Sequence, residues 1–138
     1  LVLRAHPDYT VELLFGNDDD DDDRMVTTLG NPYLLNTAFL NLIENNCKYS
    51  ANHTSIVQIS FRGEWTVVRM SDNGFGMSDK DKQNLFTLFY RGANEKTVEG
   101  HGIGMALSQK IVHLHGGNID VRSEQGNGTM FIVELPHV

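Results

Sequence analysis

The spacing of two strand-like segments in the middle of the chain constrains its fold most strongly. Residues 55–62 and 64–70 both alternate between apolar and polar side chains, and only Gly63 separates them. So short a connection joins antiparallel strands, because parallel strands need a crossover of a dozen residues or more. A similar pair, residues 118–123 and 129–135, flanks a glycine-rich turn near the C-terminus. The sheet is therefore predicted to be at least partly antiparallel.

A helix is predicted immediately before the first of these hairpins. Asn31 can cap the helix, and Pro32 suits its first turn. Residues 34–49 carry an apolar stripe at helical spacing. The stripe consists of Leu35, Phe39, Leu42 and Ile43.

Two more helices are predicted between the hairpins. Ser78 can cap a short helix that runs through residue 88, and residues 103–115 form a second helix that ends at Gly116 and Gly117. The segment 91–104 between them is polar and glycine-rich and has no periodicity. Residues 91–100 of this segment are predicted to form a mobile lid.

The N-terminal part predicts two strands, residues 10–16 and 24–29, joined as a long hairpin by the acidic run 18–23. The full order is then two strands, a helix, a hairpin, a lid, a helix and a hairpin. Strands and helices do not alternate throughout, so the fold class is α+β, with a mixed or largely antiparallel sheet and helices on one face.

Composition excludes several classes of function. The net charge is −7, but six of the 18 acidic residues form the run 18–23, and without them the 11 basic residues face 12 acidic ones. Such a balanced surface gives no reason to expect nucleic-acid binding. The single cysteine, Cys47, excludes an internal disulfide and a cysteine-based zinc site. The sequence has no apolar run near 18 residues, so this domain is not expected to enter a membrane.

The first chemically informative cluster lies within residues 41–50. Asn41, Asn45 and Lys48 fall on one face of the predicted helix. A polar stripe of this kind is often only the solvated side of a helix. Its amide oxygens are also suitable ligands for Mg²⁺ that already carries phosphate oxygens, and the lysine can meet the same phosphates.

The second cluster, residues 72–77, follows a predicted strand. Asp72 and Gly74 can form an ordinary turn. Alternatively, Asp72 is a buried carboxylate that accepts a hydrogen bond from an amino group such as adenine N6, while Gly74 and Gly76 let the backbone approach the ring.

Two further clusters flank the predicted lid. The aromatic residues of 86–90 are suited to anchoring a short helix in the core, and Arg91 after them can reach a phosphate. Gly100, Gly102 and Gly104 open a helix, where free N–H groups form an anion site. They do not follow a strand as in dinucleotide-binding folds, and they lack the Gly-Lys-Ser/Thr ending of a P-loop.

In this order, the four clusters resemble the N, G1, F and G2 boxes of histidine kinase catalytic domains. These domains share a family with gyrase, Hsp90-type chaperones and mismatch-repair ATPases. The resemblance covers residues 8–136. It implies a two-layer α/β sandwich, the Bergerat fold, with residues 1–138 as one ATP-binding catalytic domain of a sensor histidine kinase.

The resemblance also implies roles for the residues of the site. Asn45 is the Mg²⁺ ligand, Asn41 lines the phosphate site, Lys48 meets phosphate and Tyr49 lies against the nucleotide. Arg91 approaches the γ-phosphate when the lid is closed. The implied catalytic set is therefore Asn45, Lys48 and Arg91.

For the base, the resemblance implies that Asp72 binds adenine N6 and that Thr129 assists through a water molecule. The other residues implied to contact the nucleotide or to shape the pocket and lid are Gly74, Gly76, Met77, Phe89, Gly100, His101, Gly102, Ile103, Gly104 and Met105.

The sequence departs from the family pattern at two positions. The gyrase and chaperone branches carry a glutamate four residues before the Mg²⁺ asparagine, as the base for water, whereas this chain has Asn41. An amide cannot take that proton, which favours phosphoryl transfer to a partner over hydrolysis. The usual alanine after the Mg²⁺ asparagine is replaced by Asn46, which is unfavourable if Asn46 is buried.

None of the six histidines lies in a context that resembles a phosphoacceptor box. The resemblance therefore implies an acceptor histidine on a dimeric helical hairpin upstream in the same polypeptide, a homodimeric parent protein, and a response regulator as the next partner. It also implies a cytoplasmic location, with a parent that can be anchored in the inner membrane. The alternatives are a serine kinase of the anti-sigma type and a nucleotide-binding module without catalysis.

Overall fold

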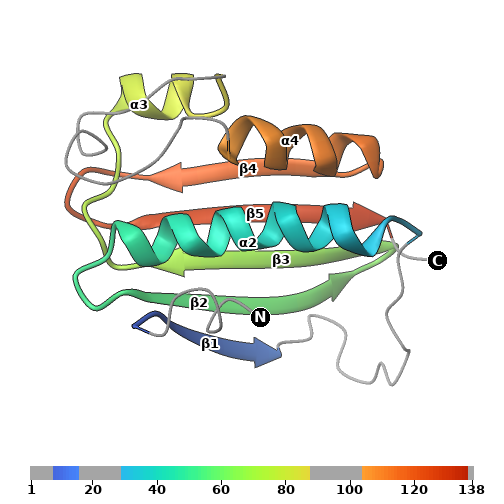
Figure 1. Cartoon of the computed structure of the whole chain (residues 1–138), viewed down its shortest axis with the longest axis horizontal. Helices are drawn as coiled ribbons and strands as arrows, with labels where there is room; N and C mark the ends of the chain where they lie inside the picture. The colour runs from blue at the N-terminus through green and yellow to red at the C-terminus, as the bar shows by residue number, and fades with distance from the viewer. Residues whose placement is uncertain (1–7, 16–28, 88–103, 137–138) are drawn as a thin grey trace.

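The structure is a computed structural model that describes residues 8–15, 29–87 and 104–136. In these residues five strands form one sheet, in the order β1-β2-β3-β5-β4 (Figure 1). β1 pairs with β2 in parallel, and the other three pairings are antiparallel. The strands are β1 (Thr10–Phe15), β2 (Thr54–Arg62), β3 (Trp65–Asp72), β4 (Asn118–Ser123) and β5 (Thr129–Pro136).

The two predicted hairpins, β2 with β3 and β4 with β5, are confirmed. The predicted N-terminal hairpin is only partly described. Its first strand is β1, which pairs with β2, while most of its predicted partner at residues 24–29 lies outside the described residues. The predicted mixed α+β sheet is observed, and among the described strands only β1 and β2 pair in parallel.

Two long helices, α2 (Pro32–Lys48) and α4 (Gly104–Leu114), cover the same face of the sheet (Figure 1). Side chains that point to this face form the core. In β3 and β5, the even and odd positions respectively face the helices. The buried core cluster consists of Leu42, Val57, Val68, Met70, Val112, Phe131, Val133 and Leu135. The predicted apolar stripe of the first helix packs on this core.

The start of α2 follows the predicted capping chemistry. The side-chain oxygen of Asn31 accepts hydrogen bonds from the backbone N–H groups of Tyr33 at 2.9 Å and Leu34 at 3.2 Å, and Pro32 occupies the first helical position. The cap satisfies two N–H groups that have no partner inside the helix. It therefore fixes where the helix that carries Asn41 and Asn45 begins.

We expect Asn31→Ala to lower the free energy of unfolding by about 1 kcal/mol, the usual cost of losing such a cap. Urea denaturation measures this change. Asn52→Ala is the matched control, because it removes an exposed asparagine side chain outside any helix. A loss no larger than that of the control would show that the cap does not stabilise the domain.

The end of α4 also follows the sequence. Gly116 has φ +75°, and the N–H of Gly117 donates to the Val112 carbonyl at 3.0 Å. A left-handed residue at this point closes the helix and turns the chain into β4. The predicted glycine stop is thereby confirmed.

The third helix, α3 (Asp79–Asn84), begins as predicted but ends earlier. Ser78 caps it by accepting from the Asp81 N–H at 3.1 Å. The prediction that it runs through residue 88 is wrong, because Leu85 and Thr87 donate to carbonyls only three residues back, at Lys82 and Asn84. These tighter turns replace the helical pattern.

The predicted lid, residues 91–100, lies outside the described part of the chain. Within the described part, none of the helices is long and apolar enough to cross a lipid bilayer.

Candidate functional site

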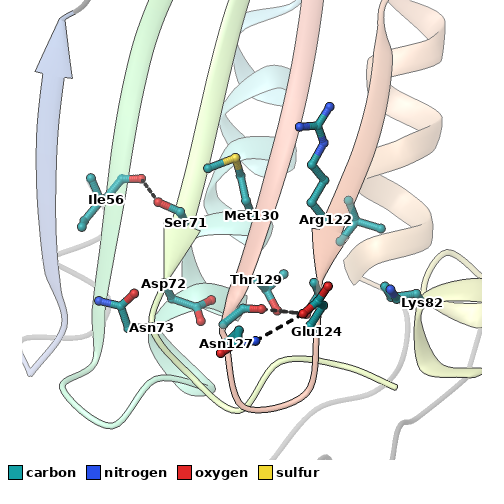
Figure 2. Close-up of a pocket in the computed structure, with 13 residues that line it drawn as sticks. Ile56, Ser71, Asp72, Asn73, Lys82, Arg122, Glu124, Asn127, Thr129 and Met130 are labelled. Atoms are coloured by element: carbon teal, nitrogen blue, oxygen red, sulfur yellow. Dashed lines mark hydrogen bonds between the residues drawn. The ribbon is translucent and has the colours of Figure 1, made fainter. Parts of the chain in front are cut away.

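Asp72 is the centre of the candidate site. It is the last residue of β3, it is 7% exposed, and it stands opposite Thr129 of β5. Figure 2 shows its carboxylate beside Thr129 at this end of the sheet. One carboxylate oxygen accepts from the backbone N–H of Gly74 at 2.8 Å, and the other accepts from the side-chain amide of Asn46 at 2.7 Å. The structure therefore holds a buried acceptor at the position predicted to bind an amino group.

The surroundings of Asp72 include groups that raise the pKa of its carboxyl and groups that lower it. Burial raises the pKa of the Asp72 carboxyl above its ordinary value, and hydrogen bonds from Asn46, Gly74 and the backbone of Thr129 oppose that rise. Donors that bond the ionised form favour that form. The three donors thus offset part of the desolvation of a carboxylate inside the fold, and burial keeps the larger effect on its pKa.

Cys47 lies close to this carboxylate but is not a candidate nucleophile. It is fully buried, and burial, followed by the charge of Asp72, raises the pKa of its thiol to about 11. The neutral thiol is a poor nucleophile.

The turn after Asp72 is tied to two other parts of the fold. The N–H of Phe75 donates to the carbonyl of Tyr49 at 3.1 Å, and the carbonyl of Phe75 accepts from the N–H of Gly126 at 2.7 Å. The N–H of Met77 donates to the hydroxyl of Ser123 at 2.9 Å. Backbone bonds therefore clamp this turn between the end of α2 and the β4–β5 turn.

Two glycines make this clamp possible. A Cβ at Gly74 would lie 1.8 Å from the Tyr49 carbonyl oxygen, and a Cβ at Gly76 would lie 1.9 Å from the Glu124 carbonyl oxygen. Gly76 also has φ +68°, which other residues rarely adopt. These two glycines therefore let parts of the fold's own backbone lie close together, and their approach to a nucleotide ring stays a prediction.

The polar face of α2 adjoins the start of α4. Asn41 donates from its side-chain amide to the carbonyl of Gly104 at 3.3 Å, and a Cβ at Gly104 would be in ordinary contact with that amide. Asn45 and Lys48 follow on the same helix and are half-buried. The predicted phosphate-site residues of α2 therefore lie on the helix that borders the N-terminal end of α4.

Asn46 is fully buried, and the unfavourable effect expected of a buried polar residue does not arise. Its amide nitrogen donates to Asp72, and its amide oxygen accepts from the hydroxyl of Ser55 at 2.9 Å. Both halves of the amide are hydrogen-bonded, so its desolvation is compensated.

Thr129 and Ser123 form a buried pair of hydroxyl groups. The side-chain oxygen of Thr129 lies 2.9 Å from that of Ser123, which also donates to the Gly128 carbonyl at 2.8 Å. Gly128 has φ +82°, and a Cβ there would lie 2.1 Å from the Asp72 carbonyl oxygen. These hydrogen bonds join the end of β4 to the start of β5, and Gly128 lets this turn lie close to the end of β3.

An open cavity of about 650 Å³ adjoins this end of the sheet. Asp72 and Thr129 contribute to its wall, but much of the wall comes from the face that the helices do not cover, including Ser71, Arg122 and Met130 (Figure 2). Of the residues predicted to bind a nucleotide, only Asp72 and Thr129 line this cavity.

The predicted site residues divide into two groups. Those within the described part lie on α2 or directly after it, at the end of β3 and in the turn that follows, and at the starts of α4 and β5. They are Asn41, Asn45, Lys48, Tyr49, Asp72, Gly74, Gly76, Met77, Gly104, Met105 and Thr129. Met105 packs against the core. The predicted residues outside the described part are Phe89, Arg91, Gly100, His101, Gly102 and Ile103.

Sequence reasoning missed Ser55, Ser123 and Gly128. Each serine lies two residues from a core residue of its own strand. Ser55 therefore points to the same face as Val57, and Ser123 to the same face as Val121. A small polar residue at an inward position was the available signal for each of them. Gly128 follows a turn, and nothing local distinguishes its close contact with Asp72.

Comparison with known proteins identifies the family to which this chain belongs. Residues 30–138 match the family model of histidine kinase-, DNA gyrase B- and HSP90-like ATPases, and the chain belongs to this family.

Among curated relatives, the methanogenesis regulatory histidine kinase FilI of Methanothrix harundinacea is 38% identical over 72% of this chain. The signal transduction histidine-protein kinase ArlS of Staphylococcus aureus is 30% identical over 93% of it. The chain is therefore an ATP-binding catalytic domain of the histidine kinase type. It spans only 11% of the length of FilI and 28% of that of ArlS.

Solved structures show the same fold. The mycobacterial sensor histidine kinase MprB superimposes with a TM-score of 0.82 at 24% identity, covering 99% of this chain and 88% of that one. Full-length ShkA in complex with AMPPNP gives a TM-score of 0.70 at 22% identity, covering 98% of this chain and 27% of that one. The predicted α+β sandwich is confirmed.

Proposed function

We propose that residues 1–138 form one catalytic domain that binds Mg²⁺-ATP and transfers the γ-phosphoryl group to a histidine on another part of the same polypeptide. The observation that carries this proposal is the buried Asp72, held by Gly74 and Asn46 beside Thr129. A fixed carboxylate at the end of a strand suits the amino group of adenine. The relatives are histidine kinases, which favours a histidine as the acceptor.

The polar face of α2 would receive the phosphates. Asn41 and Asn45 offer amide groups, and Lys48 offers a cation at the last residue of the helix. Arg91 would add a second cation from outside the described residues. Phosphoryl transfer needs charge neutralisation and alignment more than covalent help from the protein, so these residue types are adequate.

The residues of α2 also fit a magnesium ion that arrives with the nucleotide. Within the described residues, no three histidine, cysteine, aspartate or glutamate side chains converge on a metal site. Mg²⁺ keeps few protein ligands when phosphate oxygens are present, and the amide oxygen of Asn45 suits such a site. When bound, the ion would offset negative charge on the phosphates.

In the proposed reaction, an imidazole nitrogen attacks the γ-phosphorus and the bond from that phosphorus to the β–γ bridging oxygen breaks. ADP leaves with the electron pair, and the phosphoryl group stays on the imidazole. The base that removes the imidazole proton would belong to the acceptor domain. We further propose a homodimeric parent whose acceptor lies on a helical hairpin, a response regulator as the next recipient, and a cytoplasmic site of action.

The test supplies the helical hairpin of the full-length polypeptide to the domain in trans, with γ-labelled ATP. We expect slow labelling of the hairpin that increases with its concentration, because the tether that normally raises the local concentration is missing. The label should be lost in acid and kept in base, as phosphohistidine is. A hairpin with its histidine replaced by alanine is the control.

An acid-stable label on that hairpin would contradict histidine transfer and favour the serine kinase alternative. Binding of ATP without any labelling, even in the full-length protein, would favour a nucleotide-binding module without catalysis.

A further inference from the structure

Asn46 connects three elements of the fold through hydrogen bonds alone. It lies on α2, it donates to Asp72 at the end of β3 at 2.7 Å, and it accepts from Ser55 on β2 at 2.9 Å. Asn46 and Ser55 are fully buried, and Asp72 is 7% exposed. The three side chains form a continuous line of buried polar groups from α2 to β2 and β3.

The chemistry of the three groups fixes the direction of each hydrogen bond. An ionised carboxylate only accepts, so the nitrogen of the Asn46 amide must face Asp72. The amide oxygen then faces Ser55, whose hydroxyl must donate. Turning the amide over would place its oxygen against the carboxylate. The orientation of Asn46 is thus set by Ser55 on one side and Asp72 on the other.

This line holds one oxygen of Asp72, while the N–H of Gly74 holds the other at 2.8 Å. A carboxylate gripped at both oxygens by donors on different elements cannot turn freely about its terminal bond. The backbone of Thr129 is a third donor to this carboxylate. Because each oxygen can accept more than one hydrogen bond, the three donors leave acceptor capacity for a ligand. The remaining acceptor directions are therefore fixed before any ligand arrives.

We propose that Asn46, supported by Ser55, is a positioning residue that aims the Asp72 carboxylate at the amino group of adenine and thereby sets the preference for adenine over 6-oxopurines. This inference rests on the proposed role of Asp72 in nucleotide binding. It goes beyond that role, because it assigns base selectivity to two residues that would not touch the nucleotide.

The selectivity follows from the fixed carboxylate. Adenine presents a donor at its 6-position, whereas hypoxanthine and guanine present a carbonyl oxygen there. A carboxylate that cannot turn away meets that oxygen as a repulsive neighbour. A mobile carboxylate can rotate or admit a water molecule, so it would reject the oxygen less strongly and bind the amino group less well.

The test compares the dissociation constants of ADP and inosine diphosphate, measured by calorimetry with Mg²⁺. For Asn46→Ala we expect the preference for ADP to fall roughly tenfold, the size of one hydrogen bond to a charged group. For Ser55→Ala we expect a smaller fall in the same direction, because Asn46 keeps its bond to Asp72 but loses its support. A role in stability alone would weaken the binding of both nucleotides equally.

Ser60→Ala is the matched control. Ser60 is also buried on β2, five residues after Ser55, but its hydroxyl accepts from Arg69 at 3.0 Å and has no contact with Asp72. We expect its ADP preference to equal that of the wild type. If Asn46→Ala does not fold, the comparison of Ser55→Ala with Ser60→Ala decides the question.

Asp72→Asn distinguishes the proposed role of Asp72 in binding the base from the proposed positioning role of Asn46 and Ser55. A wild type without a preference for ADP would contradict the proposed role of Asp72 itself. A wild-type preference that Asp72→Asn removes, but that Asn46→Ala and Ser55→Ala both leave unchanged, would overturn the positioning role and leave the proposed function intact.

Discussion

Replacement of Gly74 by alanine is expected to lower the free energy of unfolding by about 3 kcal/mol and to remove measurable binding of Mg²⁺-ADP. The added Cβ would lie 1.8 Å from the Tyr49 carbonyl oxygen and 2.8 Å from a carboxylate oxygen of Asp72. The Tyr49 oxygen belongs to the backbone, and the Asp72 carboxylate is held by hydrogen bonds, so the backbone must move. A cost at the upper end of the range for overpacking follows.

The loss of binding follows from what must move. The Tyr49 carbonyl accepts from Phe75, and the N–H of Gly74 holds Asp72. A shift of this turn therefore changes the carboxylate as well as the end of α2. Urea denaturation and calorimetry with Mg²⁺-ADP measure the two effects.

Gly63→Ala is the matched control for this substitution. Gly63 lies in the β2–β3 turn with φ +60°, and a Cβ there would meet no atom within 4 Å. We expect it to cost about 1–2 kcal/mol through its left-handed conformation, with no change in ADP affinity. Wild-type affinity in a folded Gly74→Ala variant would contradict the role assigned to this turn.

The elements that the sequence predicts well are those with local signals. The β2–β3 and β4–β5 hairpins need only alternation and a short turn, and the ends of α2 and α4 need only Asn31 and Gly116. Each signal acts between residues that are close in the chain. Their positions could therefore be inferred without knowledge of the tertiary structure.

The parts that could not be predicted depend on distant contacts. The pairing of β1 with β2 joins Thr10 to Thr54, and nothing in either segment specifies a parallel partner. The end of α3 was missed for a local reason instead: Leu85 and Thr87 donate to carbonyls three residues back, so tight turns replace helical hydrogen bonds after Asn84. Local preference is a weak guide where tertiary contacts decide.

In the candidate site, too, features with local signals could be predicted and features that depend on distant contacts could not. The position of Asp72 at a strand end follows from the hairpin, and the structure confirms it. The bond between Asn46 and Ser55 does not follow, because it depends on how α2 lies across β2. From sequence alone, Asn46 was expected to be unfavourable only if it were buried. It is buried, and the fold supplies partners for both ends of its amide.

The isolated domain is expected to release phosphate from Mg²⁺-ATP very slowly. The gyrase and chaperone branches, which the sequence resembles, carry a glutamate at the position of Asn41. Here Asn41 carries an amide whose nitrogen donates to the Gly104 carbonyl at 3.3 Å, and an amide cannot accept a proton from water at neutral pH. The loss of a general base costs roughly a factor of 10² to 10⁴ in rate.

Glu44 does not replace the missing base. It precedes Asn45 by one residue, so its side chain points about 100° away around the helix from that of Asn45. A continuous phosphate-release assay measures the rate, and Asp72→Asn provides the background. We expect this variant to bind ATP more weakly, because the amide loses a charged acceptor for the base. At ATP concentrations well below saturation, release that is unchanged in this variant therefore comes from a contaminant. Transfer to the supplied hairpin should exceed release to water by roughly 100-fold or more at saturating hairpin, because only the acceptor brings its own base. Phosphate release at the rate of transfer would instead require a base that Asn41 cannot provide, and would place the chain with the ATPases of its family.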